Sequence, residues 1–295
     1  MGGAGAERSG RTLMVEGTAP PFGYVGGKTK TAKQILSYFP DHKVYVEPFF
    51  GSGALFFAKG YKKVSNSHDY REVIGDLDGN ITNFFEQLRS HPDELQAILE
   101  TFEYSEAMFA RCKRTSEYYQ NASPLLKAAL VYYRIQNSFG SSQSSFAFCK
   151  KGPIQPQAFK HKVAKLPAFT DRLRDAYIFN KPYQVLFERF DSKDTFFYLD
   201  PPYKGTAKYL VQEEEFDYVE FAERVKALEG NWILSHYRDE WLEETFSDYD
   251  TVDIFHTPTI AKTNGEPRYT TGAQEAIVLG LKRVVTGQLE IFAGT

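Results

Sequence analysis

The tetrapeptide Asp200–Tyr203 (Asp-Pro-Pro-Tyr) carries the clearest chemical signal, because it directly follows the apolar run Thr195–Leu199. Its two prolines fix the backbone and lack N–H donors, so their carbonyl oxygens are expected to be free acceptors. Asp200 adds a carboxylate and Tyr203 adds a flat ring. This set suits the exocyclic amine of a planar base, since acceptors that bind both N–H hydrogens make the nitrogen more nucleophilic. The alternative interpretation is a rigid turn with a surface tyrosine.

A second candidate is the glycine-containing segment Glu47–Gly53 (EPFFGSG), which follows the short strand predicted at Lys43–Glu47. Glycines let the backbone approach a ligand closely, and the helix predicted after the turn offers free N–H groups. No Lys-Ser or Lys-Thr pair follows the glycines, which disfavours a phosphate-binding P-loop. The segment therefore indicates a nucleotide-type pocket, or a tight turn between a strand and a helix.

Two further residue groups add polar chemistry. Asp76 ends the strand predicted at Glu72–Gly75, about 20 residues after the glycine turn, where an acid can accept hydrogen bonds from ribose hydroxyls. Asp78 is a competing candidate, and a helix N-cap is the alternative role. The segment Tyr24–Lys28 (YVGGK) combines two glycines with a cation for a carboxylate or phosphate, or forms a turn with an exposed lysine.

Alternating strands and helices position these groups. The predicted strands are Lys43–Glu47, Glu72–Gly75, Thr195–Leu199, Trp232–Ser235, Tyr249–Phe255 and Glu275–Leu279. The predicted helices are Thr29–Phe39, Ala54–Ala58, Ile81–Leu88, Phe159–Asp175 and Phe216–Leu228, with a helical pattern over 93–135. This alternation predicts an α/β fold with a mostly parallel, Rossmann-like sheet, whose ligands bind beyond the carboxyl ends of the strands. Glu47, Asp76 and Asp200 are all expected at that edge.

The predicted strands of the sheet come from two separate parts of the sequence, and the segment between them is polar and basic. Residues 137–157 are rich in Ser, Gly and Gln and are predicted as loops with a possible hairpin. The segment from Ser142 to Pro182 contains eight Lys or Arg residues and only two Asp, although the whole chain has a formal net charge of −3. We therefore predict a catalytic domain at 20–90 and 183–285, a mostly helical insert at 91–182 that concentrates positive charge, and flexible tails at 1–19 and 286–295.

Composition narrows the functional classes. Two cysteines, Cys112 and Cys149, offer neither a metal-binding spacing nor a disulfide framework, and no histidine cluster is present, so no metal site is predicted. The two cysteines without a disulfide framework fit a reducing, cytoplasmic environment. No apolar run approaches about 18 residues, which predicts no membrane span and no membrane partner.

In order, YVGGK, VEPFFGSG, IGDLD and YLDPPY resemble the Dam-type, class alpha DNA adenine-N6 methyltransferases. The resemblance covers roughly Phe22 to Gly280. It implies a site-specific enzyme that transfers the methyl group of S-adenosylmethionine to an adenine flipped out of duplex DNA. It implies as catalytic residues Asp200, Pro201, Pro202 and Tyr203. It implies as cofactor-binding residues Tyr24, Gly26, Gly27, Lys28, Glu47, Pro48, Phe49, Gly51, Gly53, Asp76 and Asp200.

The family's recognition segment often reads LNRxGxNG, whereas the chain has QNSFGSSQ at 136–143, with Ser138 at the arginine position. Specificity is therefore not carried over. An acid often precedes the DPPY strand in the family, and here Asn180 stands in that neighbourhood. The polar and basic side chains of the insert nevertheless suit DNA. The candidate DNA-binding residues are Asn137, Ser138, Gly140, Ser142, Gln143, Phe146, Lys150, Lys151, Lys160 and Lys162, with Phe146 or Phe148 as a wedge into the duplex.

Other interpretations remain open. A non-catalytic module that binds S-adenosylmethionine and DNA would keep the same fold. An amino-methyltransferase for cytosine N4, RNA or a protein glutamine would use a similar tetrapeptide, although cytosine N4 enzymes more often carry Ser in place of Asp. The implied partners are double-stranded DNA and a cognate restriction endonuclease, and the oligomeric state stays open between a monomer and a weak dimer. His236, after the strand at Trp232–Ser235, is a further residue that could border the site, or a structural histidine.

Overall fold

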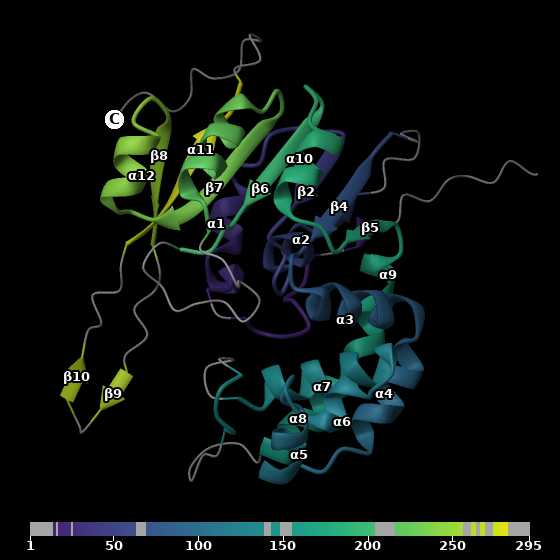
Figure 1. Cartoon of the computed structure of the whole chain (residues 1–295). Coiled ribbons are helices and arrows are strands. Elements are labelled where there is room, and N and C mark those ends of the chain that lie inside the picture. Colours follow the sequence, from purple (N-terminus) through teal and green to yellow (C-terminus); the bar gives the residue numbers. More distant parts are fainter. Residues whose placement is uncertain are drawn as a thin grey trace, which may run out of the picture.

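A seven-stranded sheet forms the centre of the computed structural model (Figure 1). The structure describes residues 14–15, 17–24, 26–62, 69–138, 143–147, 155–203, 216–255, 261–263, 266–268 and 274–282. The strand order is β5-β4-β2-β6-β7-β11-β8. The strands are β2 (Val44–Glu47), β4 (Arg71–Gly75), β5 (Ala176–Phe179), β6 (Thr195–Leu199), β7 (Asn231–Tyr237), β8 (Asp250–Ile254) and β11 (Glu275–Gly280).

Strand direction confirms the predicted mostly parallel sheet. Neighbouring strands from β5 to β7 pair in parallel, whereas β11 runs antiparallel to both β7 and β8. Within the described residues, two short antiparallel pairs lie outside this sheet. They are β1 (Met14–Val15) with β3 (Tyr61–Lys62), and β9 (Ala261–Thr263) with β10 (Glu266–Arg268).

Alternate residues of the central strands supply two separate apolar cores. Tyr45 and Phe196 face one core, while Val46 and Phe197, one position along, face the other. Because side chains alternate across a strand, a strand buried on both faces reads as an uninterrupted apolar run. The first core includes α1 (Ala32–Leu36), α2 (Ala54–Lys59) and α3 (Gly79–Ser90). The second includes α10 (Tyr183–Phe190), α11 (Tyr218–Ala227) and α12 (Glu240–Thr245), in front of the sheet in Figure 1.

A helical unit lies below the sheet in Figure 1. It contains α4 (Pro92–Glu100), α5 (Glu106–Arg111), α6 (Glu117–Gln120), α7 (Pro124–Gln136), α8 (Gln155–Val163), η3 (Leu166–Phe169) and α9 (Thr170–Leu173). The ring of Phe84 in α3 stacks on Tyr132 in α7, with ring centroids 5.4 Å apart. This contact makes the core of the helical unit continuous with one face of the sheet. Every helix in the described part of the chain is too short or too polar to cross a lipid bilayer.

The structure corrects three elements of the sequence prediction. Strand β5 was not predicted, although it pairs with β4 and forms one edge of the sheet inside the range 91–182. Only Ala176 of its four residues is fully buried, so the apolar pattern is weak. The helix predicted at Phe159–Asp175 is broken into α8, η3 and α9, with Pro167 in the 3-10 turn. The helix predicted at Thr29–Phe39 is a 3-10 turn, η1 (Lys28–Lys30), followed by the five-residue α1.

A buried ion cluster ties α9 to the sheet. Arg172 donates to both carboxylate oxygens of Glu72 and to the backbone oxygen of Phe56, and its guanidinium lies 3.4 Å from the Phe56 ring centroid. Lys59 also pairs with Glu72. Burial would raise the pKa of Glu72, but Lys59 and Arg172 outweigh that effect and lower it. The carboxylate is therefore held ionised inside the protein by two cations.

The substitution Arg172→Met should lower the free energy of unfolding by about 3 kcal/mol, because it leaves a buried carboxylate with one cation in place of two. Arg174→Met, two residues along, removes an exposed pair with Asp171 and should change stability by less than about 0.5 kcal/mol. Urea unfolding followed by circular dichroism measures both. Equal effects of the two substitutions on the free energy of unfolding would contradict the stabilising role of the buried Arg172–Glu72 pair.

Candidate functional site

The sheet topology brings three acids to one edge. Strands β4, β2 and β6 are consecutive neighbours and run in parallel, so Glu47, Asp76 and Asp200 lie at or just beyond their carboxyl ends. The strand order switches between β2 and β6, because β4 and β5 extend the sheet on one side of β2 and the later strands β6 and β7 extend it on the other. Such a switch point is where open α/β sheets bind ligands.

Asp200 is held by a buried lysine. The Lys28 ammonium lies 2.8 Å from each Asp200 carboxylate oxygen and 2.9 Å from the backbone oxygen of Gly26. It also lies 3.0 Å from Oε1 of Glu275, and the Lys28 side chain is 3% exposed. Burial would lower the pKa of Lys28, but the two carboxylates outweigh it and raise it. Burial raises the pKa of Asp200, against the opposing effect of Lys28.

Tyr203 is enclosed at the same edge. Its hydroxyl donates to Oε1 of Glu275 over 2.7 Å, and its ring lies 4.8 Å from the ring of His236 and 4.5 Å from that of Tyr237. His236 is fully buried and borders the tetrapeptide through this ring contact. The Tyr203 residue is 7% exposed, so a base can reach its ring only if neighbouring side chains move.

One expectation about the prolines is wrong. The hydroxyl of Tyr218 donates to the carbonyl oxygen of Pro202 over 3.0 Å, so that oxygen is already paired. The sequence does not show this hydrogen bond, because Tyr218 begins α11, a separate helix whose position against the tetrapeptide is set by the tertiary structure. The carbonyl of Pro201 remains the candidate acceptor beside Asp200.

The glycine turn is built around Asp76. Gly51 and Gly53 have φ angles of +49° and +71°, which side chains rarely tolerate. The carboxylate of Asp76 accepts from the backbone N–H of Gly51 over 2.8 Å and from that of Asp78 over 2.8 Å. Asp78 is the N-cap of α3, since its side chain accepts from the N–H of Asn80. The capping role therefore belongs to Asp78, and Asp76 connects the glycine turn to the end of β4.

Glu47 and Asp76 both have raised pKa values. Burial raises the pKa of Glu47 to about 8, against the hydrogen bond that its carboxylate accepts from Tyr45 over 2.7 Å. Burial raises the pKa of Asp76 to about 6, against its two backbone hydrogen bonds. Glu47 is therefore largely protonated at neutral pH and serves as a neutral support below the turn.

The remaining predicted cofactor residues surround this turn. Pro48 is buried, and Phe49 packs against the rings of Tyr183, Phe216 and Phe221. A Cβ atom on Gly27 would lie 2.9 Å from the backbone oxygen of Tyr24, and one on Gly51 would lie 3.2 Å from the Tyr24 ring. The first motif therefore packs directly on the glycine turn, which explains the small residues at both positions.

The expected recognition loop is partly buried. Asn137, Ser138 and Gln143 are at most 6% exposed, and the hydroxyl of Ser138 accepts from the N–H of Gln143 over 3.0 Å. The ring of Phe146 packs between Tyr104 and Phe109. Contact of these side chains with DNA would require the loop to rearrange. Gly140, Ser142, Phe148, Lys150 and Lys151 lie outside the described residues.

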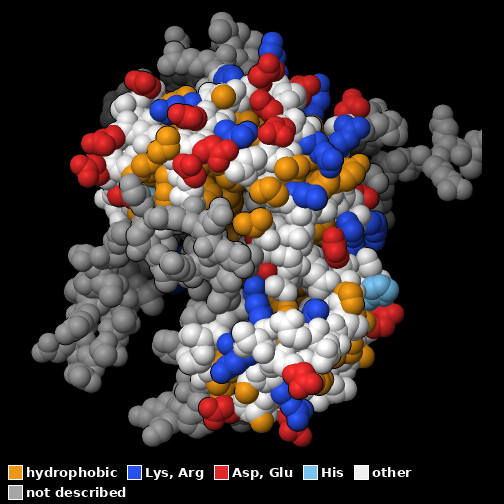
Figure 2. All heavy atoms as spheres, viewed as in Figure 1, with side chains coloured by type: hydrophobic (Ala, Val, Ile, Leu, Met, Phe, Trp, Pro, Cys, Tyr) orange, Lys and Arg blue, Asp and Glu red, His pale blue; other side chains and the backbone are white. Residues whose placement is uncertain are grey.

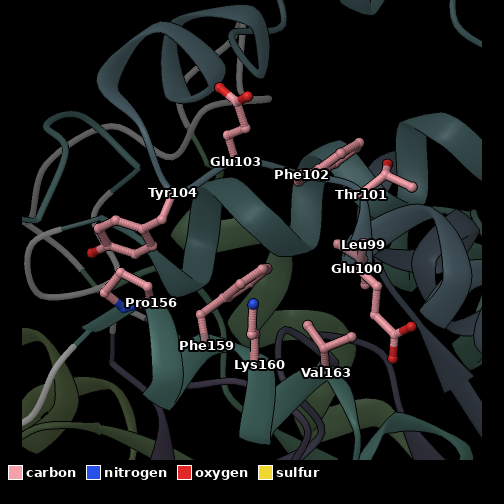
Figure 3. Close-up of a pocket in the computed structure, with 10 residues that line it drawn as sticks. All are labelled: Leu99, Glu100, Thr101, Phe102, Glu103, Tyr104, Pro156, Phe159, Lys160 and Val163. Atoms are coloured by element: carbon pink, nitrogen blue, oxygen red, sulfur yellow. The ribbon is translucent and has the colours of Figure 1, made fainter.

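Lys160 and Lys162 project from α8 and are exposed. Lys162 donates to the side-chain oxygen of Gln136 over 2.8 Å. Lys160 borders a cavity of about 460 Å³ that also contacts Phe102, Tyr104 and Phe159 (Figure 3). This cavity lies in the helical unit, away from the carboxyl edge of the sheet. On the face in view, basic and acidic side chains are interspersed over both parts of the molecule (Figure 2).

Sequence reasoning missed Glu275, Leu77 and Arg114. Glu275 was visible as an acid at the start of an apolar strand, but its role depends on β11 running antiparallel. Leu77 is 50% exposed beside Asp76, an unusual position for a large apolar side chain. Arg114, in the helical unit, forms an ion pair with Asp78. Asn180 donates to the backbone oxygens of Asp76 and Leu77 over 2.9 and 3.0 Å, so it supports the same segment.

Numbered along the chain, the sheet strands have the order 3-2-1-4-5-7-6, with the seventh reversed and acids at the switch point. This arrangement defines a Rossmann-like methyltransferase fold. A family model, described as D12 class N6 adenine-specific DNA methyltransferase, matches residues 24–244. The chain belongs to this family, which confirms the resemblance that the motifs predicted.

Two relatives are similar over parts of the chain. A DNA N-6-adenine-methyltransferase of Escherichia phage P1 is 30% identical over 81 residues, which are 28% of this chain and 10% of the phage protein. The Type II methyltransferase M.CviBI of Paramecium bursaria Chlorella virus NC1A is 24% identical over 193 residues. That alignment covers 60% of this chain and 66% of the viral protein.

The raised pKa of Glu47 makes stability depend on pH. Burial raises the pKa of Glu47 to about 8 in the folded protein, so its carboxyl keeps a proton up to about that pH, whereas the unfolded chain loses it near the ordinary glutamate pKa of 4.5. The free energy of unfolding should therefore fall as pH rises between these values, and Glu47→Gln should flatten this slope. Urea unfolding at several pH values measures it. Identical slopes in the two proteins would show that Glu47 is ionised in the fold.

Proposed function

We propose that this protein methylates N6 of adenine in DNA, with S-adenosylmethionine as the methyl donor. Family membership supports the reaction class. The observation that carries the proposal is the position of Asp200 beside the carboxyl end of β2, where the glycine turn begins. Hydrogen-bond acceptors for an amine thus lie next to a pocket suited to a nucleoside-containing donor.

The residues around the glycine turn fit the donor. The Asp76 carboxylate lies between two backbone N–H groups at the end of β4, where it can accept hydrogen bonds from ribose hydroxyls. The exposed Leu77 offers apolar surface to the donor's adenine ring. Small residues at Gly51 and Gly53 allow close backbone approach. When bound, S-adenosylmethionine supplies a methyl group on a sulfonium, and the pocket needs no metal ion for this chemistry.

The tetrapeptide would hold the target amine. Asp200 and the Pro201 carbonyl would accept the two N–H hydrogens of the amine, which favours a pyramidal nitrogen with its lone pair directed at the methyl group. The adenine must leave the base stack, because its amine is not accessible inside the duplex. Its ring would lie against Tyr203 after the side chains that cover the tyrosine move. Positioning of the two reactants is then the main catalytic contribution of the protein.

The charge of the site suits the product of the transfer. Asp200 and Glu275 carry two negative charges around the single positive charge of Lys28. The remaining negative charge favours the positive charge that develops on the amine nitrogen as it accepts the methyl group, before the nitrogen releases a proton to solvent. We propose that the helical unit within 91–182 contacts the DNA backbone, with its exposed lysines neutralising phosphate charge.

Asp200→Ala should lower the rate of methyl transfer roughly 100-fold or more, because it removes an acceptor at the reacting amine. The fold should persist, since Lys28 keeps Gly26 and Glu275 as acceptors. The assay incubates the protein with labelled S-adenosylmethionine and unmethylated genomic DNA, followed by nucleoside analysis. Asp194→Ala, at the opposite edge of the sheet, is the control. N4-methylcytosine as the product, or no transfer by the unaltered protein, would refute the proposal.

The double substitution Lys160→Ala with Lys162→Ala should weaken DNA binding and make its salt dependence less steep, because fewer counterions are released. The matched control is Lys43→Ala with Lys193→Ala, which removes the same charge near the amino ends of β2 and β6. Fluorescence anisotropy of a labelled duplex at several salt concentrations measures both. Equal salt slopes for the two double variants would place the DNA elsewhere.

A further inference from the structure

Glu275 connects two parts of the candidate active site. It is the first residue of β11 and is 4% exposed. Its Oε1 atom accepts from the hydroxyl of Tyr203 over 2.7 Å and lies 3.0 Å from the Lys28 ammonium. One carboxylate oxygen therefore holds both the aromatic residue of the tetrapeptide and the cation that binds Asp200.

The direction of β11 makes this contact possible. In a sheet of parallel strands, the carboxyl ends lie at the site and the first residue of each strand lies at the far edge. Because β11 is antiparallel, its first residue pairs with Tyr237, the last residue of β7, at the site edge. A charged residue at this position is costly to bury unless its charge is paired, and Lys28 provides that pairing.

The second carboxylate changes how strongly Lys28 neutralises Asp200. The ammonium has three N–H donors and three sets of acceptors: Asp200, Glu275 and the oxygen of Gly26. With Glu275 present, the charge of Lys28 is shared between two carboxylates. Without that charge, Lys28 would pair with Asp200 alone and weaken it as an acceptor for an amine.

We propose that Glu275 is a positioning residue for methyl transfer, which orients Tyr203 and divides the charge of Lys28 so that Asp200 remains a strong acceptor. This role rests on the proposed function. A purely structural role would need only a hydrogen-bond acceptor of the same shape. The positioning role requires the negative charge itself, so the neutral isosteric substitution Glu275→Gln distinguishes it from a purely structural role.

Ionisable groups from several elements surround this cluster. After burial, the charge of Asp200 adds to the raised pKa of Glu47 on β2, and Asp200 and Glu275 both add to the raised pKa of Tyr198 on β6. The groups on β11's neighbouring strands are Tyr237 and His236 on β7 and Asp253 on β8, the last of which pairs with Arg238. Burial raises the pKa of Asp200 most strongly and Lys28 opposes that effect, while the charge of Glu275 raises the pKa further. Removal of its charge should therefore lower the pKa of Asp200.

The test compares Glu275→Gln with Asp253→Asn, which removes the same charge from the neighbouring strand beside Ala276. Glu275→Gln should lower kcat about tenfold or more, with KM for S-adenosylmethionine within about twofold. Its acid limb of the kcat–pH profile should move to lower pH, since Asp200 then titrates at lower pH. Asp253→Asn should behave like the unaltered protein in all three measurements.

A measurement without catalysis keeps the proposal separate from the assigned activity. The pKa of Lys28 should be lower in Glu275→Gln than in the unaltered protein and in Asp253→Asn, because one of the two carboxylates that raise it is lost, as followed by NMR of labelled lysine side chains. Unchanged kcat and pH profile in Glu275→Gln would overturn the proposal. If the unaltered protein methylates no DNA, the proposed function fails, and an unchanged Lys28 pKa in Glu275→Gln would then overturn the positioning role by itself.

Discussion

The buried ammonium of Lys28 joins three segments that are far apart in the chain. It comes from the turn before α1, and it binds Asp200 after β6 and Glu275 at the start of β11. Bringing charges out of water is costly, so such a group persists only with good partners. Here it has two carboxylates and a backbone oxygen, and this arrangement fixes the tetrapeptide against the first motif. The candidate chemistry at Asp200 depends on this contact.

The helical unit is attached to the sheet at both ends of β4. Arg172 binds Glu72 near the start of the strand, and Arg114 binds Asp78 just beyond its end. Asp78 also donates its N–H to Asp76, which in turn holds the glycine turn. The helical unit and the glycine turn are thus connected through one short segment. A shared apolar core, continuous through Phe84 and Tyr132, supports the same relation.

Most of the sheet could be predicted because its strands are apolar on both faces. Thr195–Leu199 is completely buried and was recognised with the same bounds. Strand β5 was missed because an edge strand exposes half of its side chains, as the half-exposed Tyr177 shows. The helix expected at Phe159–Asp175 was too long, since periodicity does not show where Pro167 interrupts the hydrogen bonding. The local sequence pattern therefore predicts buried strands better than it predicts edge strands and interruptions in helices.

The sequence alone determined the family and most of the residues at the carboxyl edge, because short motifs with restricted backbone chemistry keep their identity whatever surrounds them. Asp200, Asp76 and the glycine turn were all found in this way. Tertiary structure decided which groups contact one another: Lys28 binds Asp200, Tyr218 occupies the Pro202 carbonyl, and Glu275 reaches the site. These contacts join residues from separate elements, and strand order and direction set them. Strand order and direction follow from the packing of the whole chain, and no short segment of the sequence determines that packing by itself.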